Sequence, residues 1–359
     1  MRICFLADGK SFHTQRWVNY FVKKGHRCHL ISLEQGTQTQ ASHHILKSYS
    51  PIPALNFILT VPQVKKTLKN LSPEILNAHF ASAYGFTGAL SGFRRLVVSC
   101  WGSDILISPG KSFAHKLRVK YVLKNADLLT CDGQDLSNAI QKLGAEKERI
   151  IVSPMGVDKE IVKKSRDRKS SKEEFVILSA RKLDPVYDVQ TLLRAASEVK
   201  KIYQGKVKFL ITGEGSQKER LLRLSRELRI DNSVEFTGFL PRKSFLGVLK
   251  KADLYVSTSL SDSTSVALLE AMALGLIPIL TDIPGNREWI KQGENGFLFS
   301  PKDFRILAEK IVFCITNFGK LDIVRDKNLS LIKDRALWED NMRKIEESFS
   351  QLIKEKLHA

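Results

Sequence analysis

The feature that most constrains the fold is an alternation of short apolar runs with amphipathic helical stretches, which passes through the chain twice. This alternation is typical of a parallel sheet covered by helices. In the first half the expected strands are Ile3–Ala7, Cys28–Ser32, Ile75–Ala78, Leu96–Cys100, Leu128–Cys131 and Ile150–Ser153, with helices such as Thr14–Lys24 and Ala114–Lys124 between them.

The pattern restarts after Lys159–Glu174, a segment dense in charge and poor in large apolar side chains, which reads as a linker. The second half has expected strands at Phe175–Ser179, Val207–Thr212, Val234–Thr237, Leu254–Ser257 and Ile277–Leu280. Its expected helices are Val189–Lys201, Gln217–Leu228, Ser244–Lys250 and Val266–Leu274, and the tail Trp338–Leu357 reads as one amphipathic helix.

The doubled pattern predicts an α/β fold of two Rossmann-like domains, and the length of 359 residues fits two domains better than one. We expect domains at residues 1–165 and 174–335, and a C-terminal helix at 336–359 that crosses back to the first domain. If the carboxyl ends of the two sheets face each other, a cleft lies between the domains.

Charge and cysteine usage bound the class of partner and the compartment. The 57 Lys and Arg exceed the 38 Asp and Glu by 19, so the chain attracts anions, although a soluble basic surface is an equally good reading of so diffuse an excess. A recognised nucleic-acid module and aromatic–basic interleaving are both absent from the sequence, so we expect no nucleic-acid partner. The five scattered cysteines form no Cys-x-x-Cys pair, which favours reduced core residues of a cytoplasmic protein.

The sequence predicts contact with a membrane surface without a membrane span. The apolar N-terminal run is too short for a signal peptide, and the uncharged apolar runs all fall short of the roughly 18 residues of a spanning helix. The basic stretch Lys111–Lys120 resembles amphipathic helices that lie on anionic membranes, so we expect weak peripheral association at the inner face of the cell membrane.

The strongest local signal for chemistry is Asp262-Ser-Thr-Ser-Val-Ala-Leu-Leu-Glu270. Here a helix begins after Ser263, Thr264 and Ser265, so its N-terminus carries a partial positive charge and open N–H groups that suit a diphosphate. Plain N-capping by Ser or Thr is the alternative reading. Glu270 stands among apolar residues with no capping role, because Ala267 occupies the position that a capping box needs, and ribose hydroxyls would supply it with partners.

Other polar clusters also follow expected strands, where open α/β sheets bind ligands. Arg181 and Lys182 could neutralise a diphosphate leaving group, or they form a solvated basic turn. Gly213-Glu-Gly215 marks a tight turn and little more by itself.

In the first half, the candidate acceptor or cleft residues are His13, His79, Trp101 and Asp104. Trp101-Gly-Ser-Asp104 combines an aromatic plate and a carboxylate, a mixture that sugar sites use, but Trp101 is equally suited to cover the core. A lone histidine is more often structural than catalytic. No His and Cys set in the sequence has zinc-ligand spacing, so we expect no metal site.

With these residues in place, nearly the whole chain resembles the retaining glycosyltransferases of family 4, which have the GT-B fold. The resemblance rests on Val234-Glu-Phe-Thr-Gly-Phe-Leu240, on Ser261–Gly275, and on Pro284-Gly-Asn-Arg-Glu288 followed by Gly293-Glu-Asn-Gly-Phe297. In the first half it rests on His13-Thr-Gln-Arg-Trp17, Trp101-Gly-Ser-Asp104 and Gly156-Val-Asp158.

The resemblance implies roles for these positions. Glu270 would hold the donor ribose, while Asp262 and the backbone of Ser263–Ser265 would face the sugar and phosphates. The diphosphate clamp would fall at Arg181, Lys182 and Tyr187. Phe239 and Leu240 would lie beside the base, and Gly213 is placed with this donor-binding set.

The chain departs from the family at three of these positions. The first Glu of the family's Glu-x7-Glu motif is the shorter Asp262, the second clamp Lys is Tyr187, and the usual active-site His of the first domain is Trp101.

The expected function is transfer of a hexose-type sugar, with retention, from a nucleoside-diphosphate sugar to a glycan or lipid-linked acceptor. Envelope polysaccharide, lipopolysaccharide or glycolipid synthesis is the expected setting, and no cofactor is expected. The alternative is a non-catalytic nucleotide-sugar-binding protein on the same fold.

Overall fold

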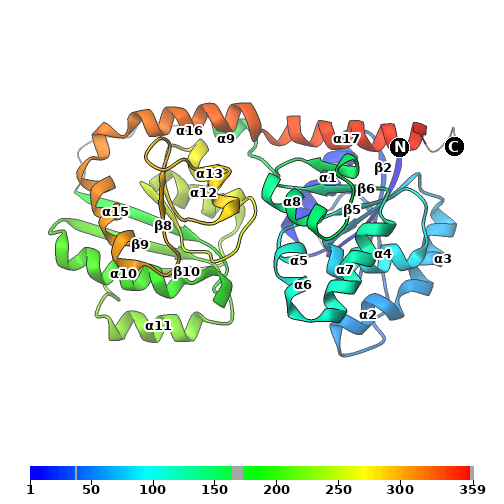
Figure 1. Ribbon diagram of the computed structural model, residues 1–359, viewed down its shortest axis with the longest axis horizontal. Coiled ribbons are helices and arrows are strands. Elements are labelled where there is room, and N and C mark those ends of the chain that lie inside the picture. The colour runs from blue at the N-terminus through cyan, green and yellow to red at the C-terminus, as the bar shows by residue number, and fades with distance from the viewer. Residues whose placement is uncertain (37–38, 164–172, 356–359) are drawn as a thin grey trace. The chain divides into compact units, whose positions relative to one another are not determined.

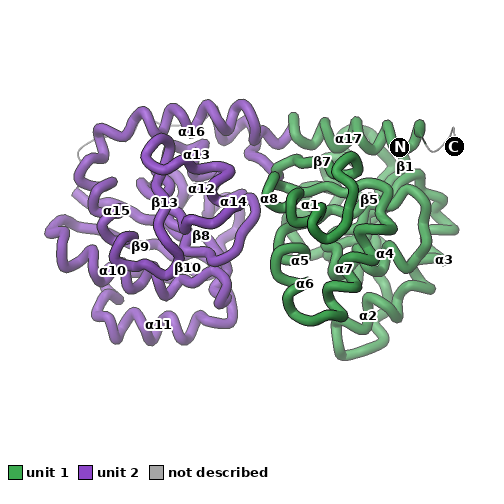
Figure 2. Tube along the Cα trace, in the orientation of Figure 1, with its two compact units in different colours: residues 1–154, 340–359 green, residues 155–339 purple. Residues whose placement is uncertain are grey.

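The computed structural model describes residues 1–36, 39–163 and 173–355, so most of the expected linker lies outside the described residues. The chain forms two compact units (Figure 2). One unit comprises residues 1–154 together with the chain from Asp340 onward, and the other comprises residues 155–339. Residues 155–163 therefore belong to the second unit and include the short helix α9 (Lys159–Val162), where the sequence suggested linker.

The first unit is built on a parallel sheet of seven strands in the order β3-β2-β1-β4-β5-β6-β7 (Figure 1). Their bounds are β1 (Arg2–Leu6), β2 (Arg27–Ser32), β3 (Ser42–Ile45), β4 (Ile75–His79), β5 (Leu96–Ser99), β6 (Leu128–Cys131) and β7 (Ile150–Val152). The six expected strands are all present within one residue at either end. The edge strand β3 was not expected, because Ser-His-His-Ile contains no apolar run.

Helices cover this sheet, and one of them comes from the far end of the chain. They are α1 (Phe12–Lys23), α2 (Pro53–Leu59), α3 (Val61–Leu71), α4 (Gly85–Ser91), α5 (Ser103–Leu106), α6 (Ser108–Lys111), α7 (Phe113–Asn125), α8 (Gln134–Lys142) and, from Asp340 onward, α17 (Trp338–Glu355). Phe349 of α17 stacks on Phe21 of α1 with ring centroids 5.3 Å apart, and Tyr20 donates a hydrogen bond to Glu346 at 2.9 Å. The C-terminal helix thus returns to the first unit, as the sequence predicted.

The second unit has a parallel sheet of six strands in the order β10-β9-β8-β11-β12-β13. Their bounds are β8 (Glu174–Ala180), β9 (Lys206–Thr212), β10 (Val234–Gly238), β11 (Leu254–Ser257), β12 (Ile277–Thr281) and β13 (Phe297–Phe299). The helices are α9, α10 (Val189–Ile202), α11 (Lys218–Glu227), α12 (Arg242–Lys251), α13 (Val266–Ala273), α14 (Pro284–Arg287), α15 (Phe304–Thr316) and α16 (Asp322–Arg335).

Two separate clusters of buried apolar side chains belong to the second unit, one including residues of α10 and α15 and the other residues of α13 and α16. Burial on both sides explains why its strands read as continuous apolar runs. Both units are α/β and Rossmann-like, which confirms the predicted fold class. Among the described residues, none of the helices combines the length and hydropathy that a membrane crossing requires.

Candidate active site

The order of strands locates the ligand-binding edge of each sheet. Strand order reverses between β1 and β4 in the first unit and between β8 and β11 in the second. Ligands of open α/β sheets bind at the carboxyl ends of the strands beside such a reversal. In the second unit, β8 leads directly into Arg181, and β11 leads into the loop that ends at Ser265, so the strongest sequence candidates meet at this point.

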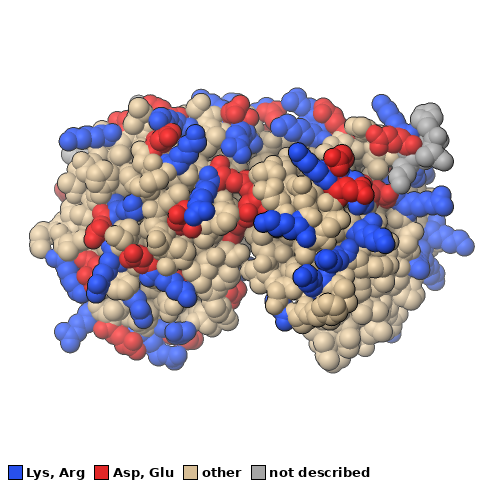
Figure 3. Space-filling view, in the orientation of Figure 1, with Lys and Arg blue, Asp and Glu red and all other residues tan. Residues whose placement is uncertain are grey.

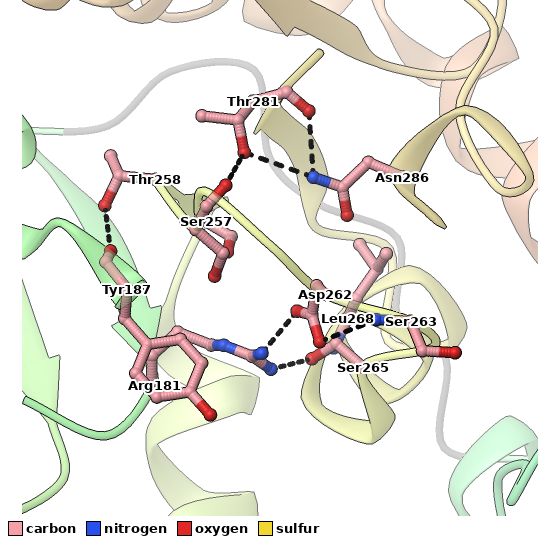
Figure 4. A network of polar contacts seen from close by, with 11 residues as sticks. Arg181, Tyr187, Ser257, Thr258, Asp262, Ser263, Ser265, Leu268, Thr281 and Asn286 are labelled. Atoms are coloured by element: carbon pink, nitrogen blue, oxygen red, sulfur yellow. Dashed lines mark hydrogen bonds and ion pairs between the residues drawn. The ribbon is translucent and has the colours of Figure 1, made fainter. Parts of the chain in front are cut away.

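Arg181 is the centre of a polar network at this edge (Figure 4). Its guanidinium forms an ion pair with Asp262 and donates a hydrogen bond from Nη1 to Ser265 Oγ at 2.7 Å. The guanidinium carbon lies 4.7 Å from the centroid of the Tyr187 ring. Burial acts to lower the pKa of Arg181, but Asp262, together with two neighbouring tyrosines, more than offsets it and raises the pKa, so the side chain stays a cation.

Three small hydroxyl residues, Ser263, Thr264 and Ser265, directly precede α13, and two of them form hydrogen bonds that fix the start of the helix. Ser265 caps the helix by accepting from the Leu268 N–H at 3.4 Å, and Thr264 Oγ1 accepts from Trp289 Nε1 at 3.1 Å. A Cβ atom on Gly285 would lie 2.4 Å from the Asp262 carbonyl oxygen, so only glycine lets α14 pack this closely under the loop. The structure confirms the N-cap at Ser265, and anion binding at this helix terminus stays a prediction.

Glu270 has a local partner that the sequence did not reveal. Only 1% of the residue is exposed, and both carboxylate oxygens face the guanidinium of Arg242, with Nη1 donating to Oε2 at 2.8 Å. Arg242 Nη2 also lies 3.6 Å from Asp158 Oδ2. The sequence analysis found no local capping role for Glu270; its partner in the structure is 28 residues away and is brought to it by α12.

The other donor-binding candidates lie at neighbouring strand ends of the same sheet. Gly213 has a φ of +135°, and a Cβ there would lie 2.2 Å from the Arg181 carbonyl oxygen, so its role is to let the two turns touch. Lys182 is exposed and lies outside the hydrogen-bonded network of Arg181. Phe239 is 77% exposed after β10, beside the partly buried Leu240.

In the first unit an aromatic cluster occupies the corresponding edge. The Trp101 ring centroid lies 5.3 Å from that of His79, 5.4 Å from that of Trp17 and 6.1 Å from that of His13, on which it stacks. His79 is buried, whereas His13 is exposed at the start of α1. The indole N–H of Trp101 is buried and has no hydrogen-bond partner among the described residues.

Asp104 holds the backbone at Trp101, one member of this cluster. It is buried, and its two carboxylate oxygens accept the backbone N–H groups of Ala81 at 2.7 Å and Trp101 at 3.0 Å. Burial raises the pKa of Asp104 to about 6, although these hydrogen bonds oppose the shift. The carboxylate thereby fixes the backbone that carries Trp101.

His79 should make the stability of the fold depend on pH. Burial lowers the pKa of His79 to about 3, from 6.5 in the unfolded chain. Between these two pH values the unfolded chain binds one more proton at this position than the folded chain does. His79 therefore lowers the free energy of unfolding as the pH falls. The pKa of Asp104 is raised to about 6, from 3.8 in the unfolded chain, so between these values the folded chain binds the extra proton and Asp104 adds stability as the pH falls. The two contributions nearly cancel between about pH 4 and pH 6.

His79→Asn should unmask the contribution of Asp104. The free energy of unfolding of the variant, relative to the parent chain, should rise by about 1.4 kcal/mol for each unit that the pH falls within this window. Urea unfolding at a series of pH values measures it. Asp104→Asn should give the opposite slope, and parallel curves for parent and variants would contradict this assignment.

A metal centre is not evident at either edge. In residues 1–36, 39–163 and 173–355, no group of three or more His, Cys, Asp or Glu side chains is arranged to hold a metal ion. Of the cationic side chains named above in the second unit, Arg181 is the most buried.

Comparison with known proteins agrees with this architecture. Over 98% of this chain and 100% of the other, the structure is similar to that of the Anabaena protein HepE solved in complex with UDP-glucose, with a TM-score of 0.83 and 21% sequence identity. It is also similar to a sucrose-phosphate synthase from Thermosynechococcus elongatus, with a TM-score of 0.83 and 14% identity over 99% of both chains. At these identities the likeness shows a shared GT-B fold.

Similarity in sequence extends to characterised families. The chain is 27% identical over 239 residues to a putative colanic acid biosynthesis glycosyltransferase, WcaL, of Escherichia coli K12, which covers 65% of this chain and 55% of the relative. Residues 2–133 match the glycosyl transferase 4-like family, and residues 160–355, more than half of the chain, match the family of group 1 glycosyl transferases. This chain belongs to the group 1 glycosyltransferase family.

Proposed function

We propose that the chain transfers a hexose-type sugar from a nucleoside-diphosphate sugar to an acceptor hydroxyl, with retention at the anomeric carbon. The observation that carries the proposal is the convergence of Arg181 and the N-terminus of α13 where β8 and β11 end. A relative with the same fold binds UDP-glucose, which supports a donor of this class.

The chemistry required of the protein is stabilisation of a leaving diphosphate. As the bond from the anomeric carbon to the phosphate oxygen breaks, negative charge builds on the diphosphate. A fixed guanidinium and the open N–H groups of a helix N-terminus stabilise that charge without reorganising. We propose that Arg181 and α13 do this without a metal ion, with Lys182 adding a screened contribution from the surface.

The acceptor is proposed to meet the aromatic cluster of the first unit. His13 and Trp101 offer stacked rings that suit the apolar face of a sugar, and the buried indole N–H of Trp101 would gain a partner from a hydroxyl group. The homologues in polysaccharide biosynthesis support a glycan or lipid-linked acceptor of the cell envelope.

Asp262→Asn tests how the donor displaces an internal partner of Arg181. In the structure the Asp262 carboxylate is paired with the Arg181 guanidinium, the group that a diphosphate would bind, and its negative charge would repel the diphosphate. Removing its charge should strengthen binding of free nucleoside diphosphate by about tenfold, while sugar transfer slows because Asp262 faces the sugar. Calorimetry and a transfer assay measure the two effects. Weaker nucleoside diphosphate binding would show that Asp262 supports the anion site instead.

The alternative function is a non-catalytic nucleotide-sugar-binding protein, which the replacements at Trp101 and Tyr187 favour. A thermal-shift screen of nucleoside diphosphates identifies the base, since the tightest ligand stabilises the fold most. Incubation with the matching labelled nucleotide-sugar then separates the two functions. A transferase releases nucleoside diphosphate slowly even without acceptor, whereas binding without any release supports the alternative.

A further inference from the structure

The first unit has exposed apolar side chains on two of its helices. On α7, Phe113, Leu117 and Tyr121 are 76%, 50% and 42% exposed. They are spaced four residues apart and so share one face of the helix. The same helix buries Val119 and Val122 in the core. It therefore carries two apolar stripes: a buried one in the core, and an outer one whose side chains stay largely exposed although Tyr121 also contacts Phe86.

The short helix α2 adds a second exposed apolar group close to the first. Both helices pack against α4: Thr87 donates a hydrogen bond to the carbonyl oxygen of Phe57 in α2 at 2.6 Å, and Phe86 lies 6.2 Å from Tyr121 of α7 between ring centroids. We call the exposed apolar residues of this region the apolar face; they are Tyr49, Ile52, Leu55, Ile58, Leu59, Phe113, Leu117 and Tyr121.

The two segments that carry the apolar face contain charges of one sign only. Residues 35–73 and 105–126 contain no Asp or Glu. The cations in these segments are Lys47, Lys65, Lys66, Lys69, Lys111, Lys116, Arg118, Lys120 and Lys124. In Figure 3 the surface over α2 is free of charged side chains, with Lys and Arg over α6 and α7 above it and the visible Asp and Glu of this unit nearer to α17.

We propose that the apolar face is a docking surface for an anionic lipid bilayer. Exposed Phe, Leu, Ile and Tyr side chains suit the boundary between headgroups and acyl chains, and lysines that surround them match anionic headgroups. An oppositely charged protein would satisfy the cations but not two apolar stripes on neighbouring helices, and a second copy of the chain would place these cations against one another. The inference goes beyond the proposed sugar transfer and does not depend on it.

The apolar face includes part of the stretch that the sequence analysis placed on a membrane, and it extends beyond that stretch to α2. The basic stretch Lys111–Lys120 led us to expect an amphipathic helix on the membrane. In the structure α7 would face the lipid with its outer stripe, while α2, which carries no charge, adds the exposed side chains Leu55, Ile58 and Leu59.

Flotation of the full-length chain with vesicles tests the proposal. Binding to vesicles of phosphatidylglycerol and phosphatidylcholine should exceed binding to phosphatidylcholine alone and should weaken with salt. Replacing Phe113 and Leu117 together by Ser should weaken it by about tenfold per side chain. Lys116→Gln with Lys120→Gln should weaken it by roughly fivefold per lysine at low salt, and less at high salt.

A matched control removes two apolar side chains of comparable exposure from the second unit, Ile202→Ser with Ile323→Ser, which are 53% and 63% exposed. This variant should float as the parent chain does, and equal melting temperatures show that each variant is folded. Undiminished flotation of the Phe113 and Leu117 variant, or equal binding to neutral and anionic vesicles, would overturn the proposal. So would a change from dimer to monomer in that variant without loss of flotation, which would assign the face to a second copy.

Discussion

Arg181→Ala should lower the efficiency of sugar transfer by about a thousandfold, the cost of removing a preorganised group that stabilises charge in a transition state. The guanidinium lies at the strand-order reversal, beside the N-terminus of α13, whereas the other partly buried arginine named above, Arg242, is paired with Glu270. Steady-state kinetics with the donor identified by thermal shift measures the effect. Binding of the free nucleoside diphosphate should fall in parallel.

Loss of Arg181 also removes the partner of Asp262, so a control must separate misfolding from loss of function. Arg325 offers a close match: its guanidinium lies 4.2 Å from the Phe318 ring and pairs with Asp322. Phe318 makes an edge-to-face contact with Phe175 near the start of β8, at the opposite end of that strand from Arg181. Arg325→Ala should lower the melting temperature but leave nucleoside diphosphate binding unchanged. Equal donor binding by Arg181→Ala and Arg325→Ala would remove Arg181 from the site.

Glu270→Gln should lower the affinity for the nucleoside diphosphate by roughly a hundredfold, because a buried carboxylate that accepts ribose hydroxyls forms strong charge-assisted hydrogen bonds. The change keeps the shape of the side chain and one acceptor for Arg242. Inorganic diphosphate lacks a ribose, so its binding should be unaffected. Arg181→Ala, in contrast, should weaken both ligands, and calorimetry with the two ligands distinguishes the roles.

Arg242 provides the second comparison. If Glu270 acts only by pairing with Arg242, then Arg242→Gln and Glu270→Gln should have the same modest effect on the donor and the same effect on stability. If Glu270 holds the ribose, Arg242→Gln should preserve most of the affinity. Full activity of Glu270→Gln at sub-saturating donor would show that Glu270 does not hold the ribose.

The sequence predicted the central strands well because burial on both faces gives them unbroken apolar runs. Leu128–Cys131 and Leu254–Ser257 were predicted residue for residue. The edge strands β3 and β13 were missed, because one is polar and the other lasts only three residues within a turn-rich segment. Their pairing is set by the neighbouring strand rather than by local pattern.

The candidate site was predictable where it follows from strand ends, and only there. That rule brings Arg181 to the loop before α13, as the structure does. The strand-end rule does not predict long-range pairs such as Arg242 with Glu270 or Trp289 with Thr264, because helix packing decides which side chains meet. The need for glycine at position 285 likewise follows only from the close approach of α14 to the Asp262 carbonyl.

The most direct test of the central claim is a crystal structure of the full-length chain with the nucleoside diphosphate that stabilises it most. The account predicts that the diphosphate contacts the Arg181 guanidinium and the N–H groups at the start of α13, that Asp262 releases Arg181, and that the ribose lies against Glu270. A nucleotide bound away from the ends of β8 and β11, with the Arg181–Asp262 pair intact, would contradict it.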